Sequence, residues 1–418
     1  MAAVTSEVAA TTDREPLKRA LRRVERRRRI GTFLLTTPLL AYLALMFVLP
    51  LGFMLWRSVA NRAVPENMTN TVQALRDWQP TSLPPESAYA ALAKDLKAAR
   101  EHHTFGRIAK RLNEVVPGMF ALISKSAFRV SRVEHGPWKP VLIKIDKRWG
   151  EMPVWRLLKR ESSPYTADFY LASLDLHYNG QGHIVREAAY NRIYVPLFIR
   201  TFWMSALITF LALALGYPLA YWLTSLPEGK SNLLMIGVLL PFWTSLLVRI
   251  TAWIVLLQSH GVLNNLMVWA HIVPDLHRPK LIYNQLGTII VMTQVLLPFM
   301  ILPLYSVMRG ISPSYMRAAI SLGSKPAYAF WRVYAPLTMP GIGAGGLLVF
   351  ILAIGYYITP ELVGGQTGQF ISNMIAYNVQ QSLNWGLAAA LGTILTAIAL
   401  IFYMAYNRIA GVGRISIG

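Results

Sequence analysis

The residues of this sequence best able to do chemistry are the charged and aromatic residues within or beside its long apolar segments. A charge within an apolar span is costly, so each one is a candidate functional residue. Arg249 lies within such a segment, four residues before Trp253, so both would share one helical face. Glu361 lies at the end of another. A carboxylate beside aromatic faces suits an organic cation. The candidate lining of a solute pathway is Trp243, Arg249, Trp253, Tyr356, Tyr357 and Glu361.

Simpler explanations for these charges stay open on the sequence alone. Glu361 would equally well pair with Arg249 or face water at the end of its helix. Arg249 would repel a cationic solute, which favours a structural or gating role for this side chain. Arg200, in the outer part of the second apolar segment, is expected to extend its charged end to the membrane interface.

No set of residues typical of an enzyme assembles. The motifs H-E-x-x-H, G-x-S-x-G and G-x-x-x-x-G-K-[ST] are absent, so these routes to a catalytic zinc, an acyl-transfer serine or an ATP site are excluded. The chain has no cysteine, which excludes disulfides and thiolate metal ligands. Its histidines are scattered. We therefore predict no catalytic residue, no metal and no cofactor, and any ATP-driven step would need another polypeptide.

The elements that must position the candidate residues are membrane helices. The chain is 54% hydrophobic and 15% charged, with a mean hydropathy of +0.39, which is typical of a polytopic membrane protein. Residues 30–56 form an apolar run that can cross a bilayer and is too long for a signal peptide. Five further spans are predicted at 195–223, 233–257, 286–307, 340–358 and 387–406. Pro241, Pro298 and Pro303 interrupt the third and fourth spans, which favours these two as cavity walls.

The distribution of positive charge predicts the orientation of the spans. Residues 1–29 form a basic tail that ends in four arginines and is expected to stay in the cytoplasm. Nucleic-acid binding is disfavoured, because no aromatic residues interleave these arginines. Loops then expected on the same side carry Lys230, Arg309 and Arg317, whereas the opposite loop at 364–385 carries no Lys or Arg. Six spans would also return the tail at 411–418 to the cytoplasm.

The segment 57–193 separates the first two spans and contains no further spanning run. Most of the chain's acidic residues lie here. A helical stretch is expected at 86–115, and the apolar alternation at 141–145, between Pro140 and Gly150, predicts a strand. We therefore expect a small α/β extracytoplasmic domain inserted before a five-helix membrane core at 194–410.

A polar, basic hairpin at 309–339 separates the fourth and fifth spans. Ser312 and Pro313 suit the start of a short helix, and Gly323 suits its end in a left-handed turn. A second short helix is expected from Pro326 to a stop at Pro336. Each would carry a narrow apolar stripe, so the hairpin could insert into a groove on another protein. An ordinary folded loop would explain the same pattern.

This hairpin resembles the coupling loop of bacterial ABC-importer permeases, whose pattern is E-A-A-x3-G-x9-I-x-L-P. The chain matches it in Ala318, Ala319, Gly323 and Pro336, and departs from it at Arg317, where the family has Glu. The resemblance implies that the loop docks into a cleft of a cytoplasmic ATPase. The residues assigned to this coupling loop are Arg317, Ala318, Ala319, Gly323, Phe330 and Pro336.

Further runs at 215–221, 240–249 and 355–365 resemble the permease subunits of spermidine/putrescine-type importers. The resemblance covers the chain from about 194 onwards. It implies an all-α polytopic fold of six helices in a bacterial inner membrane, with both termini cytoplasmic. It also implies a cytoplasmic ABC ATPase dimer, a second permease subunit and an extracytoplasmic substrate-binding protein as partners. The solute would be a polyamine or a similar cationic or amino compound, moved by alternating access.

Two other functions stay open at this point. A secondary transporter or channel would need a relay of carboxylates within the spans, and the sequence offers Glu361 at an edge. A membrane-anchored sensor built on the extracytoplasmic domain would need one or two spans rather than six.

Overall fold

The computed structural model describes residue 33 and residues 35–410. It divides the chain into two units, one up to residue 57 and one from residue 58 onwards, and each is described by itself. The predicted tails at 1–29 and 411–418 lie outside the described residues.

The first unit contributes one helical span, Leu35–Arg57, which includes the π turn η1 (Ala44–Val48) and α3 (Leu49–Arg57). Apolar side chains are exposed along its whole length, among them Leu39, Phe47 and Leu51. A helix that is apolar all round needs lipid or protein about it. This agrees with the predicted first span.

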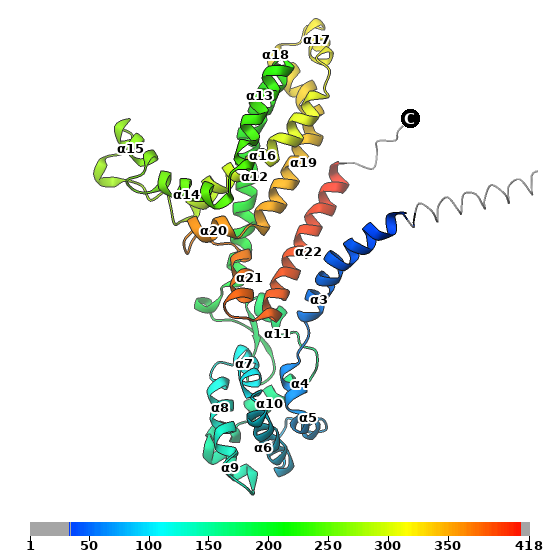
Figure 1. Cartoon of the computed structure of the whole chain (residues 1–418), viewed down its shortest axis with the longest axis vertical. Coiled ribbons are helices and arrows are strands. Elements are labelled where there is room, and N and C mark those ends of the chain that lie inside the picture. The colour runs from blue at the N-terminus through cyan, green and yellow to red at the C-terminus, as the bar shows by residue number, and fades with distance from the viewer. Residues whose placement is uncertain (1–32, 34, 411–418) are drawn as a thin grey trace, which may run out of the picture. The chain divides into compact units, whose positions relative to one another are not determined.

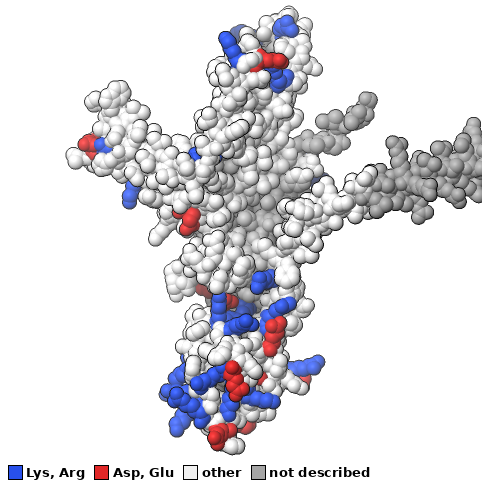
Figure 2. Space-filling view, viewed as in Figure 1, with Lys and Arg blue, Asp and Glu red and all other residues white. Residues whose placement is uncertain are grey.

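Six described helices are long and apolar enough to cross a membrane, as the sequence predicts. They are Leu35–Arg57, Tyr194–Ser225, Leu246–Trp269, Gln285–Arg309, Pro326–Gly355 and Trp385–Arg408. Figure 2 shows charged side chains gathered over the segment before α12 (Tyr194–Ser225) and near α17 (Ser314–Ser321), while the surface between them is largely uncharged. The chain is therefore a multi-pass membrane protein.

The third span lies further along the chain than the sequence predicts. The predicted span 233–257 is interrupted, because α13 (Glu228–Leu239) ends in the 3₁₀ turn η4 (Leu240–Trp243). Pro241 lies at the start of this turn, where its missing N–H breaks the helical ladder. The apolar helical region resumes as α14 (Leu246–Leu257) and α15 (Val262–Trp269).

Pro336 does not stop the second helix of the hairpin, so that prediction is wrong. The helix continues through α18 (Pro326–Ala329), the π turn η6 (Phe330–Tyr334) and α19 (Ala335–Gly355). Pro336 lies in the first turn of α19, next to the wider π turn. A proline is tolerated there because the ladder is already shifted and its missing N–H leaves no regular bond unmade.

Close packing of three helices forms the membrane core of the second unit (Figure 1). Glycines let α12 and α19 approach α16 (Gln285–Arg309). A Cβ on Gly345 would lie 2.9 Å from Met300 Sδ, and one on Gly216 would lie 3.2 Å from Met300 Cγ. Gly341 faces α16 as well, and small residues four apart on one helix allow two backbones to approach closely. The span α22 (Trp385–Ala410) follows α21 (Ile371–Gln380).

Residues 58–193, here called the inserted segment, form a helical body rather than the expected α/β domain. Its helices are α4 (Ala63–Asn67), α5 (Thr69–Leu75), α6 (Glu86–Glu101), α7 (Phe105–Val115), α8 (Met119–Val130), α9 (Trp138–Ile145), η2 (Lys147–Gly150), α10 (Met152–Glu161), α11 (Asp168–Ser173) and η3 (Ala189–Asn191). Its described strands are β1 (Leu176–Tyr178) and β2 (Ile184–Arg186), an antiparallel pair in which Leu176 lies opposite Arg186.

The predicted strand at 141–145 is wrong, because these residues belong to α9. Leu142 and Ile145 are both buried, and their spacing of three places them on one helical face. A short apolar run is ambiguous between helix and strand until its neighbours are known. The expected helix at 86–115 exists, but it is broken between α6 and α7, where His103 has a φ of 55°.

Aromatic rings form the centre of the inserted segment. The Tyr89 and Trp155 rings meet edge to face with centroids 4.6 Å apart, and the Trp149 ring lies 5.7 Å from that of Trp155. Tyr89 Oη and Trp155 Nε1 both donate to the carbonyl of Trp149, at 2.8 and 2.9 Å. The buried polar ends are thus satisfied, so this core fixes α6 against α10.

Candidate functional site

The first helix of the hairpin at 309–339 ends at the residue predicted for it. After α17 the chain turns at Gly323, whose φ is 90°. The Ser324 N–H donates to Ala319 O at 3.1 Å and the Gly323 N–H to Ile320 O at 2.9 Å, which closes the helix end. At the helix start, Ser312 Oγ accepts from the Ser314 N–H at 3.3 Å. The corner between the two short helices is therefore a defined backbone turn.

An aromatic cluster seats the second half of the hairpin on the end of α12. The Phe330 ring lies 5.5 Å from that of Tyr221, edge to face, and 5.5 Å from that of Tyr334, stacked. Tyr217 adds a further edge contact with Phe330 at 6.3 Å, and its hydroxyl bonds Thr338 Oγ1 at 3.2 Å. Phe330 thus fastens the hairpin to the membrane core and does not belong to its free surface.

The opposite face of the hairpin is apolar and exposed. Leu322 is 89% exposed, Trp331 73% and Tyr328 64%. A hollow of about 540 Å³ lies at the corner, and its lining is Ala319, Leu322, Gly323, Ser324, Lys325, Tyr328 and Val333. Large apolar side chains gathered beside a hollow are typical of a protein contact surface. Arg317 is exposed beside this face and forms no ion pair with the described residues.

Arg249 supports the break in the third span. Its Nη2 donates to Pro241 O at 2.6 Å and lies 3.4 Å from Thr244 O. These carbonyls belong to the turn η4 and to the residue that follows it, where regular helix bonds are lost. Arg249 forms no ion pair with Glu361, so of the explanations considered for its charge the structure agrees with the structural one.

Glu361 lies in α20 (Ile358–Val363) and is held by an amide that the sequence reasoning missed. Asn373 Nδ2 donates to Glu361 Oε2 at 2.7 Å and to Tyr357 O at 3.0 Å. The neighbouring Ser372 Oγ donates to Tyr356 O at 2.6 Å. The start of α21 therefore organises Tyr356, Tyr357 and Glu361 as one group. Glu361 is exposed and has no cationic partner among the described residues.

The two candidate tryptophans, Trp253 and Trp243, lie in different surroundings. Trp253 packs in a cluster with Tyr356 and donates through Nε1 to Gln294 Oε1 of α16 at 3.1 Å. Trp243 lies in η4, is 89% exposed and does not belong to this cluster. The structure thus brings Trp253, Tyr356, Tyr357 and Glu361 to one region and leaves Trp243 outside it. No sequence pattern marks Asn373 or Gln294, because both act through tertiary contacts.

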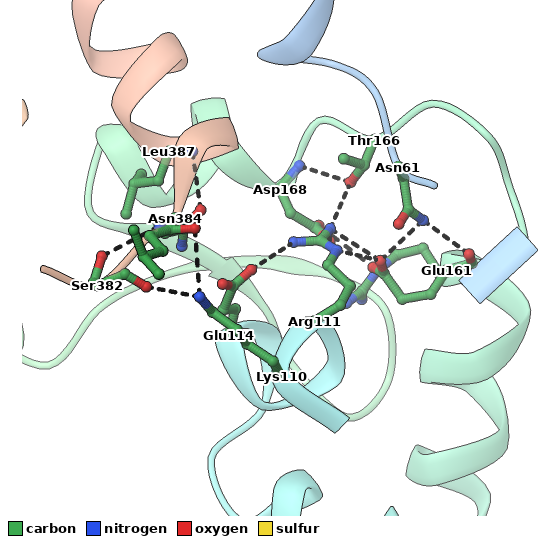
Figure 3. A network of polar contacts seen from close by, with 12 residues as sticks. Asn61, Lys110, Arg111, Glu114, Glu161, Thr166, Asp168, Ser382, Asn384 and Leu387 are labelled. Carbon is green, nitrogen blue, oxygen red and sulfur yellow. Dashed lines mark hydrogen bonds and ion pairs between the residues drawn. The ribbon is translucent and has the colours of Figure 1, made fainter. Parts of the chain in front are cut away.

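A buried ion network in the inserted segment is a further polar feature that the sequence reasoning missed (Figure 3). Arg111 Nη2 lies 2.9 Å from Glu161 Oε2 and 3.1 Å from Asp168 Oδ2. The Asn61 side chain donates to Glu161 O at 2.8 Å. The Arg111 guanidinium therefore contacts two carboxylates and joins α7 to α10 and α11.

The two carboxylates of this network titrate differently. Burial raises the pKa of Glu161 to about 8, and its hydrogen bond with Asp168 acts in the same direction. Burial alone would also raise the pKa of Asp168, but the bond with Glu161 and the charges of Arg160 and Arg111 lower it. One carboxylate thus keeps a proton to high pH while the other stays ionised.

Comparison with known proteins gives relatives among transport permeases. No family model matches the chain. It is 36% identical over 228 residues to the spermidine/putrescine transport system permease protein PotB of Haemophilus influenzae, covering 53% of this chain and 79% of that protein. It is 33% identical over 223 residues to PotB of Escherichia coli, covering 52% and 80%. The inner membrane ABC transporter permease protein YdcU of Escherichia coli is 33% identical over 236 residues, covering 54% and 74%.

Solved structures give a weaker likeness. A chain of a bacterial alginate ABC transporter in complex with an alginate pentasaccharide-bound periplasmic protein has 18% sequence identity and a TM-score of 0.44. The likeness covers 53% of this chain and 80% of that one.

Proposed function

Since this chain belongs to the family of spermidine/putrescine-type ABC transport permeases, we propose that its solute is a polyamine or a similar organic cation. The chain is the membrane permease subunit of an ABC importer, a multi-pass inner-membrane protein rather than an enzyme. Such a subunit works with a cytoplasmic ABC ATPase dimer, a second permease and an extracytoplasmic substrate-binding protein, and we take these as its partners.

The group organised by Asn373 supports a cationic solute. Glu361 is a carboxylate with one amide hydrogen bond and no ion pair among the described residues, and Ser372 and Asn373 also bind the backbone carbonyls of Tyr356 and Tyr357. An ammonium ion gains from both a carboxylate and aromatic faces. Arg249 would repel this solute. Its Nη2 is bound to Pro241 O at 2.6 Å, which fixes the guanidinium at the turn η4 but leaves its charge in place.

The exposed face of the hairpin supports docking of the ATPase. Its apolar side chains surround the hollow at Gly323, while Phe330 anchors the hairpin to α12. A protein partner that fills the hollow would bury Leu322 and Tyr328. The residues we assign to this contact are Arg317, Ala318, Ala319 and Gly323, with Phe330 and Pro336 positioning it.

The orientation follows from this assignment. An ATPase contact requires the hairpin to lie in the cytoplasm. With six spans, both termini would then lie on the same side as the hairpin, and the inserted segment would lie outside. The domains we propose are 1–29, a first span within 30–56, the inserted region 57–193, the core 194–410 with the coupling loop 309–339, and the tail 411–418.

The transport mechanism that fits these parts is alternating access. ATP-driven closure of the ATPase dimer would move the hairpins and favour the outward-open state, and a loaded binding protein would favour the same state. Each ligand shifts the equilibrium only by its differential affinity for the two states. Glu361 would bind the ammonium group in the outward state.

Uptake of labelled spermidine by proteoliposomes of the whole complex tests the proposed solute. We expect saturable, ATP-dependent uptake that putrescine inhibits and sulfate does not. Glu361→Gln should raise the KM by about tenfold, because loss of one charge contact is worth about 1.4 kcal/mol, with little change in the maximal rate. Glu228→Gln is the control for KM, since this carboxylate lies away from Glu361 and pairs at 2.8 Å with Arg309, the first residue of the hairpin. No spermidine uptake, or an unchanged KM in Glu361→Gln, would contradict the proposal.

A further inference from the structure

The inserted segment is tied directly to the start of α12. Asp175 is 2% exposed, and its carboxylate accepts from the backbone N–H groups of Ile193, Tyr194 and Val195 at 3.1, 3.0 and 2.8 Å. These are N–H groups that a helix start leaves without an intrahelical partner. A negative charge there is also favoured by the helix dipole. The cap therefore links residue 175 of the inserted segment firmly to a membrane helix.

A second tie reaches the start of α22. Lys110 Nζ of α7 donates to Ser382 O at 2.7 Å and lies 3.4 Å from Leu383 O, in the turn before α22 (Figure 3). Leu383 has a φ of 52°, an uncommon value for a leucine. Asn384 Oδ1 then accepts from the Leu387 N–H at 3.1 Å and caps the helix. Lys110, which belongs to the inserted segment, thus stabilises a strained turn at the start of α22.

Apolar packing accompanies this second tie. Phe169 of α11 shares a buried cluster with Leu387 and Leu391 of α22 and with Leu197 of α12. A Cβ on Gly386 would collide with the Phe169 ring, so the ring lies directly on the backbone of α22. The same ring lies 4.4 Å from the Arg111 guanidinium. Both membrane helices therefore meet the inserted segment at one packed junction.

The helix that carries Lys110 is itself fixed within the inserted segment. Its next residue, Arg111, is buried and binds Glu161 of α10 and Asp168 of α11. Adjacent residues of a helix point about 100° apart. Lys110 and Arg111 therefore fasten α7 to two different bodies, the turn before α22 and the interior of the inserted segment.

We propose that Lys110 is a positioning residue for transport, which joins α7 of the inserted segment to the start of α22, so that α7 moves as one body with α22 and with α12, whose start Asp175 ties to the same segment. The inference rests on the proposed function, because these two helices belong to the transport core. Without the Lys110 contact, the turn at 382–384 could move independently of α7. The start of α22 would then change state without carrying α7 with it, and the rate of the transport cycle would fall while solute affinity would not.

Lys97 provides a matched control within the same segment. Its Nζ donates to Val133 O at 2.7 Å, the same donor, acceptor type and distance as in the Lys110 contact. Both partners of this bond belong to the inserted segment. Removal of the Lys97 amine therefore costs a comparable hydrogen bond without touching α22.

The experiment compares Lys110→Met, Lys97→Met and Lys110→Arg in the full complex reconstituted in proteoliposomes. We expect Lys110→Met to lower the maximal rate of spermidine uptake about fivefold with KM within twofold of wild type. Lys97→Met should stay within twofold in both parameters, and Lys110→Arg should restore the rate. Equal rates for the two Met variants would overturn the proposal, as would a change confined to KM.

Hydrogen exchange in the same complexes tests the contact apart from the solute. The amides of 384–388 should exchange at least tenfold faster in Lys110→Met than in Lys97→Met. Faster exchange with an unchanged cycle rate would mean a merely structural tie and would overturn the proposal. If the wild-type complex takes up no spermidine, the proposed solute is wrong. The rate of the transport cycle is then measured as ATP hydrolysis by the reconstituted complex.

A reversible cross-link distinguishes loss of the Lys110 contact from misfolding of the variants. The chain has no cysteine, so Lys110→Cys with Ser382→Cys gives two unique thiols. A short bifunctional thiosulfonate should restore the rate lost in the double variant, and a reducing agent should abolish it again in the same sample. An unchanged rate across linked and reduced states would refute the role assigned to Lys110.

Discussion

Substitution of Gly323 by alanine tests whether the shape of the hairpin corner carries the ATPase contact. Gly323 has a φ of 90°, and an added Cβ would find no heavy atom within 4 Å. Alanine therefore meets no steric clash with the rest of the protein. Its whole cost is the left-handed backbone conformation, about 1–2 kcal/mol for a residue other than glycine.

This free energy sets the size of the expected effect. A cost of about 1–2 kcal/mol lowers the population of the native corner roughly 5- to 30-fold relative to alternative conformations of the loop. If only the native corner docks, the apparent affinity for the ATPase falls by up to that factor. Gly323→Asn should lose less than Gly323→Ala, because asparagine tolerates the left-handed region better.

Gly182 offers a control with the same backbone. It lies in the turn between β1 and β2, its φ is also 90°, and an added Cβ there would also find no heavy atom within 4 Å. Gly182→Ala should therefore cost the same backbone energy at a place that is not part of the hairpin. The assay is the equilibrium affinity of the purified ATPase for each permease variant in lipid nanodiscs. Wild-type affinity in Gly323→Ala, or equal losses in both alanine variants, would refute the reasoning.

Two further predictions concern stability. Gly345→Ala should lower the free energy of unfolding by about 1–3 kcal/mol, because its Cβ would lie 2.9 Å from Met300 Sδ. Gly237→Ala is the control: its Cβ would find no heavy atom within 4 Å, so it should be neutral or stabilising. Thermal unfolding in detergent compares the two variants. The raised pKa of Glu161, about 8, means that the folded state holds this proton more tightly than the unfolded state, so its contribution to stability is complete below about pH 4.5 and is lost as the pH rises through 8. The free energy of unfolding, followed by tryptophan fluorescence on heating, should fall by up to about 1.4 kcal/mol per pH unit between pH 5 and 8, and Glu161→Gln should remove this slope. A slope that persists in Glu161→Gln would assign the pH dependence to other groups.

Hydropathy predicts the number of membrane spans well, because each span is long and apolar, although the third span lies further along the chain than predicted. The number of spans and the left-handed turn at Gly323 are both confirmed. The errors arise where neighbours decide the outcome. Pro336 continues a helix because a π turn precedes it, and the run at 141–145 is helical because one helical face of it is buried.

The candidate site was predictable only in part, for a related reason. Residue type singles out Glu361, Arg249 and the aromatic residues, because such side chains are costly or distinctive beside lipid. What each one binds depends on residues far along the chain. Asn373 reaches Glu361 from another helix, and Arg111 joins three helices across 57 residues. Neither contact leaves a periodic or compositional trace in the sequence.

The unbroken helix from Pro326 to Gly355 has a mechanical consequence. At about 1.5 Å per residue its 30 residues form a rod of roughly 45 Å, with the exposed corner of the hairpin at one end and Tyr356 beside the other. Pro336 does not interrupt this helix, so axial movement at the corner would reach Tyr356, reduced by any bending at the π turn η6 and at Pro340, which lies inside α19. The π turn also allows a rotation. If it changed to a regular α-helical turn, one half of the helix would rotate against the other by about 100°.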